Sequence, residues 1–472
     1  MTMKVLMLGW EYPPHIAGGL GIACHGLSES LKDEGVHITF VVPHLSGDED
    51  ASRINLISAS TIPITLASSN SVLTVTRLES ADMPHIETIL VESTLSSYNL
   101  AHIDEEVDEI QHWNNQILTE VNDVNHQTET TGTYKFKGGY GKDLIKEVAR
   151  YASVVEEIAR NTEFDIIHAH DWMTYPAGLA ASRCSGKPLV IHVHATEFDR
   201  AGDSGSAAVY DIEKTAINEC DGIVAVSKWT SDILVSKYDA SPGKIQVVHN
   251  GIFQASESKE RSLSPVGDKI VTFLGRVTFQ KGPEYFVDAA RKVIKEFPDC
   301  HFVMAGSGDA LPQMINRVAN AGMSRNFHFT GFLNKKDIDR LLSFTNVYVM
   351  PSVSEPFGIT PLEAIQANVP VIISKQSGVS EVVANALKVD FWDTDALSNA
   401  ICSVLKHKSL AETLSKKAMD DLSSITWNSA AKKIKRLYYE TISAGQAGTQ
   451  RKARDPLLPG SPAKTIEEVG VS

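Results

Sequence analysis

Short unbroken runs of apolar, largely β-branched residues alternate along this chain with segments of helical spacing, in two successive series. Such runs are typical of strands in a parallel sheet that helices cover on both faces. Strands are predicted at residues 4–8, 38–42, 165–169, 189–193, 222–226 and 245–249, and again at 270–274, 301–305, 346–350 and 370–373. Helices are expected at about 20–33, 141–160, 283–296, 310–321, 335–343 and 360–367. The alternation predicts an α/β protein with two doubly wound domains, each binding ligand at the carboxyl ends of its strands.

Polar stretches divide and interrupt the two series. Residues 254–268 are dominated by Ser and Glu, which suits a linker. Residues 97–133 are rich in Asn, Thr, Glu and Gln, and we expect a partly helical insertion there. The last residues lack hydrophobic periodicity and are expected to be disordered. The predicted organisation is a first domain (1–255), a linker (256–268), a second domain (269–426) and a disordered tail (444–472).

Composition restricts the class of protein. The chain has 472 residues, 43% of them hydrophobic and 22% charged, as in globular proteins with more than one core. Its formal net charge of −14 disfavours nucleic acid as a partner. No apolar run is long enough to span a bilayer, and the apolar start fits a strand better than a signal peptide, so no integral membrane association is expected. Five scattered cysteines without a CxxC pair disfavour a zinc site or disulfides, which predicts a reduced, cytoplasmic location.

Two loops that follow predicted strands carry groups suited to phosphate. The segment Gly18-Gly19-Leu20-Gly21 opens the first helix, where backbone N–H groups can approach an anion; a tight turn explains the glycines equally well. Arg276 and Lys281 fall in the loop after the first strand of the second domain, before Pro283, which suits a first helical turn. Two cations at that edge match a diphosphate, although solvated loop charges are the alternative.

The most specific pattern is the segment PSVSEPFGITPLEA at residues 351–364, which follows a predicted strand. Thr360 and Glu363 have the spacing of a capping box, so one interpretation is that Glu363 only satisfies backbone N–H groups at a helix start. That interpretation leaves Glu355 and the loop 357–359 unexplained. Backbone N–H groups of such a loop suit an anion or sugar hydroxyls.

Two strand ends carry paired histidines. His168 and His170 precede Asp171, and His192 and His194 end the next strand. At strand spacing, the members of each pair share a face. A metal-dependent hydrolase that uses these histidines as ligands is one hypothesis. Because any α/β enzyme places polar site residues at strand ends, a site without a metal is the favoured prediction.

Taken together, the motifs resemble those of the family 4 retaining glycosyltransferases, and among them the glycogen and starch synthases. The resemblance rests on the glycine loop, on Gly-Arg-x4-Lys-Gly at residues 275–282, and on Glu355 with Glu363 in Glu-x7-Glu, in that order. It covers about residues 3–443 and implies the GT-B fold, in which two Rossmann-like domains face a central cleft. The acceptor then lies mainly on the first domain and the donor on the second. The family also implies that residues 427–443 form a helix that crosses back to the first domain.

The resemblance implies roles for residues on both domains. On the donor side these are Gly18, Gly19, Arg276 and Lys281 toward the phosphates, Glu355 toward the transferred sugar, Phe357, Gly358 and Ile359 toward its hydroxyls, Thr360 toward a phosphate and Glu363 toward the ribose. His194 would lie beside the sugar and the acceptor, and Asp171 in the acceptor site. The residues expected to take part in catalysis are Glu355, His194, Arg276, Lys281 and Asp171. Glycogen synthases carry a Lys where this chain has Ile16, so one of their phosphate contacts is missing or supplied elsewhere.

The implied reaction is hexose transfer with retention of configuration, without a metal or other cofactor. The physical task is to stabilise negative charge on the leaving diphosphate and positive charge on the sugar. We expect glucosyl transfer from UDP-glucose or ADP-glucose to an α-glucan, as in glycogen biosynthesis. The alternatives are a mannosyl or sucrose-type transferase of the same fold acting on a small or lipid-linked acceptor, a metal-dependent hydrolase, and a non-catalytic carbohydrate-binding protein.

Overall fold

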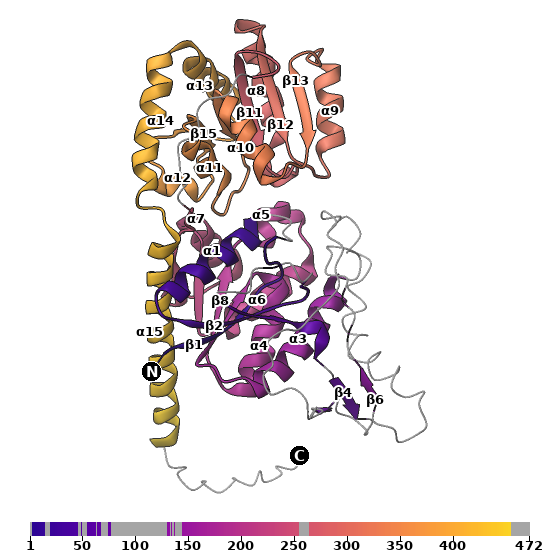
Figure 1. Cartoon of the computed structure of the whole chain (residues 1–472), viewed down its shortest axis with the longest axis vertical. Helices are drawn as coiled ribbons and strands as arrows, with labels where there is room; N and C mark the ends of the chain where they lie inside the picture. Colours follow the sequence, from indigo (N-terminus) through magenta and orange to yellow (C-terminus); the bar gives the residue numbers. More distant parts are fainter. Residues whose placement is uncertain are drawn as a thin grey trace, which may run out of the picture.

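Two α/β domains stand end to end in the computed structural model (Figure 1). The structure describes residues 2–14, 19–45, 49, 54–62, 64–67, 74–76, 130–132, 134, 136, 144–253 and 264–454. Most of the predicted insertion (97–133) and of the predicted linker (256–268) therefore lies outside the described residues. The chain passes between the domains twice, and these passages lie side by side, since the Ile252 N–H donates to the Ile425 carbonyl at 3.2 Å.

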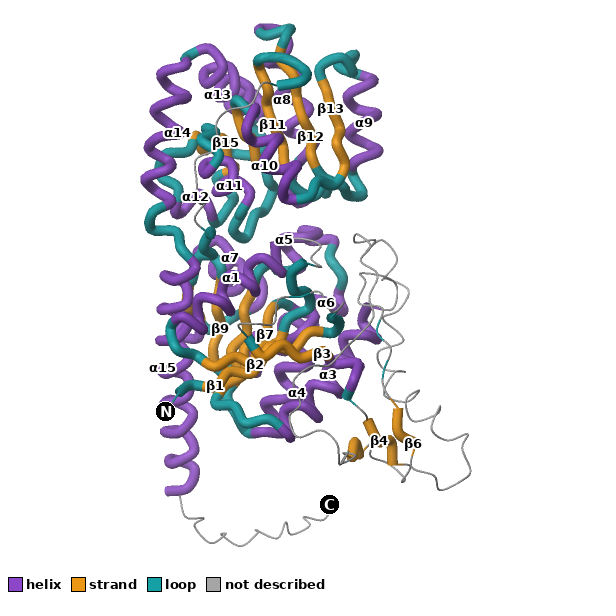
Figure 2. Tube along the Cα trace, viewed as in Figure 1, coloured by secondary structure: helices purple, strands orange, loops and turns teal. Residues whose placement is uncertain are grey.

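The first domain contains a seven-stranded parallel sheet in the order β10-β9-β8-β7-β1-β2-β3 (Figure 2). Its strands are β1 (Lys4–Leu8), β2 (His37–Val42), β3 (Asn55–Ser58), β7 (Ile166–His170), β8 (Leu189–Val193), β9 (Gly222–Ala225) and β10 (Ile245–Val247). From β1 the chain builds outward in one direction to β3, and from β7 in the other to β10. The order therefore reverses between β1 and β7, where a doubly wound sheet leaves space for a ligand at its carboxyl edge.

Helices cover both faces of this sheet. They are α1 (Gly19–Asp33), α3 (Leu144–Asn161), α4 (Tyr175–Ser185), α5 (Glu197–Ala201), α6 (Ala207–Glu219) and α7 (Lys228–Tyr238). Apolar side chains of α3, α4 and α6 fill one face, and those of α1 fill the other. A separate antiparallel sheet joins β4 (Ile64–Ala67) to β5 (Thr74–Thr76) and to β6 (Thr130–Gly132).

The second domain repeats this plan with six parallel strands in the order β13-β12-β11-β14-β15-β16. The strands are β11 (Lys269–Leu274), β12 (Cys300–Ala305), β13 (Phe327–Gly331), β14 (Val347–Met350), β15 (Val371–Ser374) and β16 (Leu387–Val389). The helices are α8 (Pro283–Glu296), α9 (Leu311–Asn320), α10 (Lys335–Phe344), α11 (Thr360–Gln366), α12 (Val379–Val382), α13 (Thr394–Lys406) and α14 (Lys408–Leu422). Here the order reverses between β11 and β14, so the loops after these two strands share one edge.

Helix α15 (Trp427–Arg454) returns to the first domain and packs beside α1 (Figure 1). Gly26 of α1 makes room for it, since a Cβ there would come within 2.4 Å of the Trp427 ring. The helix continues past residue 444, where the sequence predicted disorder. That prediction was wrong as far as Arg454, because Ala, Gln, Lys and Arg favour a helix that packing has already nucleated. Among the described residues, no helix has the length and apolarity that a membrane crossing requires.

The predicted class, two doubly wound α/β domains, is confirmed. The sequence did not predict the edge strands β3, β13 and β16, the small sheet of β4, β5 and β6, or the helices α4 to α7 and α12 to α14. β13 and β16 each have only a single neighbouring strand and are mostly half-buried, so their sequences lack the continuous apolar run of a central strand.

Candidate active site

Most of the predicted site residues follow the strands at which the two sheets reverse, and His194 follows the neighbouring strand β8. Gly19 opens α1 after β1, and Asp171 directly follows β7. In the second domain, Arg276 and Lys281 follow β11, and the segment 351–364 follows β14. In Figure 1, α5 and α7 of the first domain and α11 and α12 of the second lie at the edges where the domains face each other. Both sets of motifs therefore lie at facing carboxyl edges.

Lys281 and Glu355 form an ion pair at the carboxyl edge of the second sheet. The Lys281 Nζ lies 2.5 Å from the Glu355 Oε2, and the Ser352 hydroxyl donates to the same oxygen at 3.2 Å. The Glu355 side chain is only 7% exposed and that of Lys281 19%. The pair joins two loops that are 74 residues apart in the sequence. A buried carboxylate with a cation beside it provides charges of both signs where a polarised bond can be placed.

The loop that carries Arg276 and Lys281 depends on glycine. Gly282 has φ +62°, and a Cβ there would lie 2.2 Å from the Pro351 carbonyl oxygen. Only glycine allows the β11 loop to lie this close to the loop after β14. The Arg276 Nη2 donates to the Gln280 Oε1 at 3.1 Å, so the guanidinium is held by its own loop.

The loop 357–359 reaches toward the first domain. Gly358 has φ +98°, which turns the chain sharply before α11. A Cβ on Gly19 would lie 4.0 Å from the Ile359 Cδ1, so the start of α1 faces this loop across the domain boundary. Gly18 and Ile16 lie outside the described residues.

Thr360 and Glu363 do not form the capping box that their spacing suggested. Thr360 is the first residue of α11, and its hydroxyl shares a hydrogen bond with the Tyr348 hydroxyl at 2.7 Å. Glu363 accepts from the Lys335 Nζ at 2.7 Å. The capping-box interpretation was wrong because Ile359 is the N-cap residue, and the carboxylate reaches outward to a lysine of α10.

His194 and Asp171 are joined through the backbone. The Asp171 Oδ1 accepts from the N–H groups of His194 at 2.8 Å and Ala195 at 3.3 Å. Asp171 is 6% exposed and has φ 62°, a conformation that its side chain and neighbours must hold in place. The His194 Nε2 lies 2.9 Å from the Nδ1 of His170. Burial lowers the pKa of His194 despite the opposing effect of Asp171, so its imidazole is neutral at pH 7.

A network of buried charged side chains packs against the loop that follows His194. The Arg200 guanidinium donates to Glu197 at 3.2 Å, to Glu213 at 3.0 Å and to the Ala195 carbonyl at 2.9 Å. Glu213 also accepts from the Glu197 N–H and from the Tyr238 hydroxyl. Burial raises the pKa of Glu213 to about 7, against the opposing effect of Arg200. The network fixes the loop that follows His194.

The paired histidines form a stack beside Tyr438 of α15. His168, His170 and His192 are at most 2% exposed, and each offers a ring nitrogen within 4.8 Å of the others. Burial lowers the pKa of His168 to about 3 and lowers the pKa values of the other two well below their usual range, so the rings are neutral. Their planes lie within 11–30° of one another. Because nitrogen lone pairs lie in the ring plane, near-parallel rings do not direct them to one tetrahedral centre, which favours stacking over a metal site.

The sequence patterns did not indicate a role for three residues near the site, Phe332, Ser354 and Glu381. Phe332, after β13, is 72% exposed, unusually far for a large aromatic side chain. Ser354 and Glu381 bond to the first domain: the Trp229 Nε1 donates to the Ser354 hydroxyl at 3.0 Å, and the Trp229 N–H donates to Glu381 at 2.8 Å. These partners are more than 100 residues apart in the chain, so no local pattern links them.

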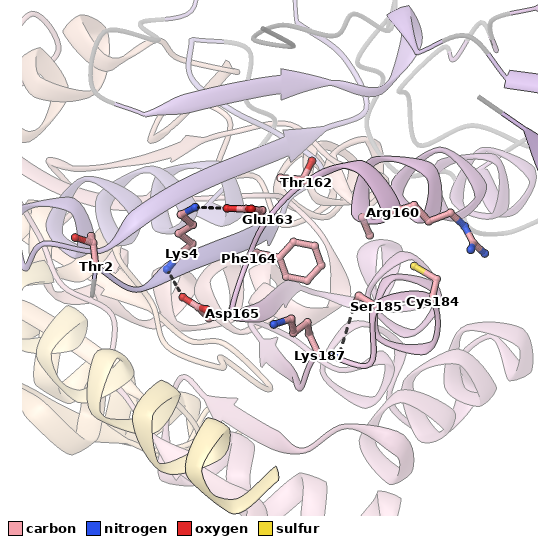
Figure 3. A pocket seen from close by; sticks show the side chains of 11 residues that line it. Thr2, Lys4, Arg160, Thr162, Glu163, Phe164, Asp165, Cys184, Ser185 and Lys187 are labelled. Carbon is pink, nitrogen blue, oxygen red and sulfur yellow. Dashed lines mark hydrogen bonds and ion pairs between the residues drawn. The ribbon is translucent and has the colours of Figure 1, made fainter. Parts of the chain in front are cut away.

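A surface hollow lies at the opposite end of the first domain (Figure 3). Its lining includes Lys4 at the start of β1 and Glu163 and Asp165 just before β7. The Lys4 Nζ pairs with Glu163 at 2.7 Å, and the Lys4 N–H donates to Asp165 at 2.8 Å. These groups close the amino edge of the sheet and are remote from the motifs at the carboxyl edge.

Comparison with known proteins agrees with this arrangement. A family model described as glycosyl transferases group 1 matches residues 254–421, and one described as glycosyltransferase family 4 matches residues 127–253. An uncharacterized glycosyltransferase of Methanocaldococcus jannaschii is 26% identical over 454 residues, 92% of this chain and 98% of its own length. A glycogen synthase of Mycobacterium tuberculosis is 25% identical over 465 residues, 97% of this chain and 98% of its own. The solved sucrose-phosphate synthase of Thermosynechococcus elongatus has a TM-score of 0.66 at 17% identity, covering 94% of this chain and 100% of that one.

The two family models together match residues 127–421, which is more than half of the chain. With two doubly wound domains whose motifs lie at facing edges, the chain belongs to the family 4 glycosyltransferases and has the GT-B fold. It is therefore an enzyme that transfers a sugar.

Proposed function

We propose that the protein transfers a hexose from a nucleotide sugar to a carbohydrate acceptor, with retention of configuration and without a metal. The observation that carries this proposal is the ion pair of Lys281 and Glu355 at the point where the second sheet reverses. A leaving diphosphate needs a cation, and a developing sugar cation needs a nearby negative charge. This pair supplies both, in a setting largely shielded from water.

The proposed donor site uses the carboxyl edge of the second domain. Arg276 and Lys281 contact the diphosphate, and the backbone N–H groups of residues 357–359 contact sugar hydroxyls and phosphate. Glu363 accepts from the ribose hydroxyls, and its ion pair with Lys335 engages one carboxylate oxygen, Oε1. The exposed ring of Phe332 offers a surface on which a nucleobase can stack.

The proposed transfer breaks the bond between the sugar C1 and the diphosphate oxygen and forms one between C1 and an acceptor oxygen. The electron pair of the broken bond goes to the diphosphate, where Arg276 and Lys281 stabilise it. The proton of the acceptor hydroxyl passes to a phosphate oxygen, so no separate protein base is needed. Neutral His194 lies on the acceptor side and can hydrogen-bond to the sugar.

We propose glucose from UDP-glucose or ADP-glucose as the transferred sugar and an α-glucan as the acceptor. Similarity to a glycogen synthase over nearly the whole of both chains supports this choice. The His-Asp-Trp turn at 170–172, which resembles the synthases, supports it as well.

The test is release of nucleoside diphosphate by the purified protein from UDP-, ADP- and GDP-hexoses, with glycogen, maltose or no acceptor. Glycogen-stimulated release from UDP-glucose or ADP-glucose is the expected result and names the donor. Release only with another sugar or a small acceptor would replace the α-glucan by a mannosyl or sucrose-type reaction on the same fold. Unchanged rates after removal of divalent ions with EDTA are expected, and a loss restored by one added metal would contradict the metal-free mechanism.

A further inference from the structure

One hydroxyl group connects the donor loop with two elements of the first domain. Ser354 directly precedes Glu355. Its Oγ donates to the Asp199 Oδ1 at 2.5 Å and accepts from the Trp229 Nε1 at 3.0 Å. Asp199 belongs to α5 and Trp229 to α7, so a single serine of the second domain contacts two helices of the first.

Asp199 uses its two carboxylate oxygens for different partners. While Oδ1 reaches Ser354, Oδ2 accepts from the N–H and the hydroxyl of Thr196, each at 2.8 Å. The Thr196 hydroxyl in turn accepts from the Asp199 N–H at 3.3 Å, which completes a capping box at the start of α5. Thr196 lies two residues after His194. The carboxylate therefore holds the loop of His194 with one oxygen and the loop of Glu355 with the other.

Burial strengthens the hydrogen bond between Ser354 and Asp199. Asp199 is 1% exposed, and burial raises its pKa although Ser354, Thr196 and Arg200 all act to lower it. A hydrogen bond to a carboxylate shielded from water is stronger than one at the surface and costs more to break. Water cannot readily replace Ser354, because the carboxylate is almost fully covered.

Separate contacts hold the domains together. Glu381 of α12 accepts from the N–H groups of Lys228 at 2.9 Å and Trp229 at 2.8 Å, and pairs with His249 at 2.7 Å. At the same place Gly378 lies so close to the first domain that a Cβ would come within 2.5 Å of the Ser227 Cβ. The bond between Ser354 and Asp199 is therefore not required to keep the domains in contact, and its consequence is the relative position of two loops.

We propose that Asp199 is a positioning residue for the transfer, which sets the His194 loop and the Glu355 loop in register through the Ser354 hydroxyl. This inference rests on the proposed roles of His194 and Glu355. Transfer requires the acceptor oxygen and the sugar C1 to approach within about 3–3.5 Å, and a displacement of about 1 Å between the two loops lowers the rate by about a hundredfold. Substrate binding to either domain alone does not depend on the bridge.

The test compares Ser354→Ala with Ser354→Thr, Asp199→Asn and the double variant Ser354→Ala/Asp199→Asn. Ser354→Ala should lower kcat by about tenfold to a hundredfold, the effect of losing a hydrogen bond to a charged group. The affinity for UDP or ADP, whichever the release assay identifies, should stay within about threefold, because those contacts lie in the second domain. Ser354→Thr keeps the hydroxyl and should recover most of the rate. Asp199→Asn also weakens the Thr196 contacts, so it should lower kcat at least as much as Ser354→Ala, and the double variant should be little worse than Asp199→Asn alone.

Ser380→Ala is the matched control, because in the part of the chain that the structure describes its hydroxyl donates to the Lys375 and Ser377 carbonyls of its own domain. It should keep the wild-type kcat. A wild-type kcat for Ser354→Ala, or a loss of kcat in Ser354→Ala that is fully explained by a lower fraction of folded protein, would overturn the inference. If Ser354→Ala and Lys281→Ala are both fully active, the proposed site itself is wrong. If Lys281→Ala is inactive while Ser354→Ala is fully active, the proposed site stands and only the role of Asp199 is rejected.

Discussion

Replacing Lys281 by methionine tests the centre of the proposed site. Methionine keeps most of the length of the side chain and removes its charge. The Glu355 carboxylate, 7% exposed, then loses its cation and retains the Ser352 hydroxyl, which donates to Oε2 at 3.2 Å. Breaking a buried ion pair by removing one partner costs about 3–5 kcal/mol. Because the Lys281 side chain is 19% exposed and partly screened, we expect a loss of about 2–3 kcal/mol in unfolding free energy.

Two assays separate stability from catalysis. Thermal unfolding of Lys281→Met should show a Tm lower by about 4–12 °C, since 1 kcal/mol shifts the Tm of a domain of this size by about 2–4 °C. Turnover should fall by at least about a hundredfold, the usual effect of losing one contact to the charge of the transition state. Lys281→Met/Glu355→Gln removes both charges, so it should regain most of the lost stability and remain inactive.

The reasoning is refuted by either of two results. If Lys281→Met keeps its turnover while its Tm falls, the ion pair serves only folding. If Tm and turnover are both unchanged, the two side chains do not form the contact that the structure shows. Arg317→Met is a suitable control, because Arg317 also pairs with a carboxylate, Asp288 at 2.6 Å, but is 42% exposed and remote from the reversal point of the sheet.

Three further outcomes follow from other contacts. Burial raises the pKa of Glu213 from 4.5 to about 7 on folding, so the folded chain binds this proton more tightly than the unfolded chain does. The protonated Glu213 therefore contributes up to about 3 kcal/mol to the unfolding free energy below about pH 4.5, and this contribution is lost as the pH rises through 7. Glu213→Gln should remove that slope from urea unfolding measured at pH 5–8, and an identical slope in both proteins would contradict the assignment. Lys335→Ala releases Glu363 from its ion pair and should change the KM for the nucleotide sugar by about threefold to tenfold with little change in kcat; a change in kcat alone would place Lys335 elsewhere in the reaction. Gly282→Ala forces a side chain against the Pro351 carbonyl at a positive φ and should lower the unfolding free energy by at least about 2 kcal/mol, whereas Gly186→Ala, also at positive φ but with nothing within 4 Å, should cost about 1 kcal/mol; equal losses would show that steric contact is not the cause.

The sequence alone predicted on which loops the candidate residues lie. Arg276 and Lys281 follow one strand, and the segment 351–364 follows another, in the order the motifs indicated. Their placement in the fold could be predicted because a parallel strand must be followed by a loop at its carboxyl edge, so any polar residue just after an apolar run lies at that edge of the sheet. The two-domain class was predicted for the same reason.

The sequence failed where local and tertiary partners compete for the same group. The spacing of Thr360 and Glu363 suggested a capping box, but Tyr348 and Lys335 take those side chains in the folded chain. A short-range pattern describes what a residue can bond to nearby, and it contains no information about a lysine 28 residues away. The continuation of α15 to Arg454 was missed because helix propensity alone is a weak signal until packing supports the helix.

Sequence therefore determined which groups reach the facing edges of the two domains, since strand and loop periodicity is encoded residue by residue. Tertiary structure decided which of those groups meet: Lys281 with Glu355, Ser354 with Asp199, and Glu381 with the start of α7. These partners are 74, 155 and 153 residues apart. Their distances depend on how the two sheets twist and how the domains dock, which is a property of the packed cores as a whole and of no single segment.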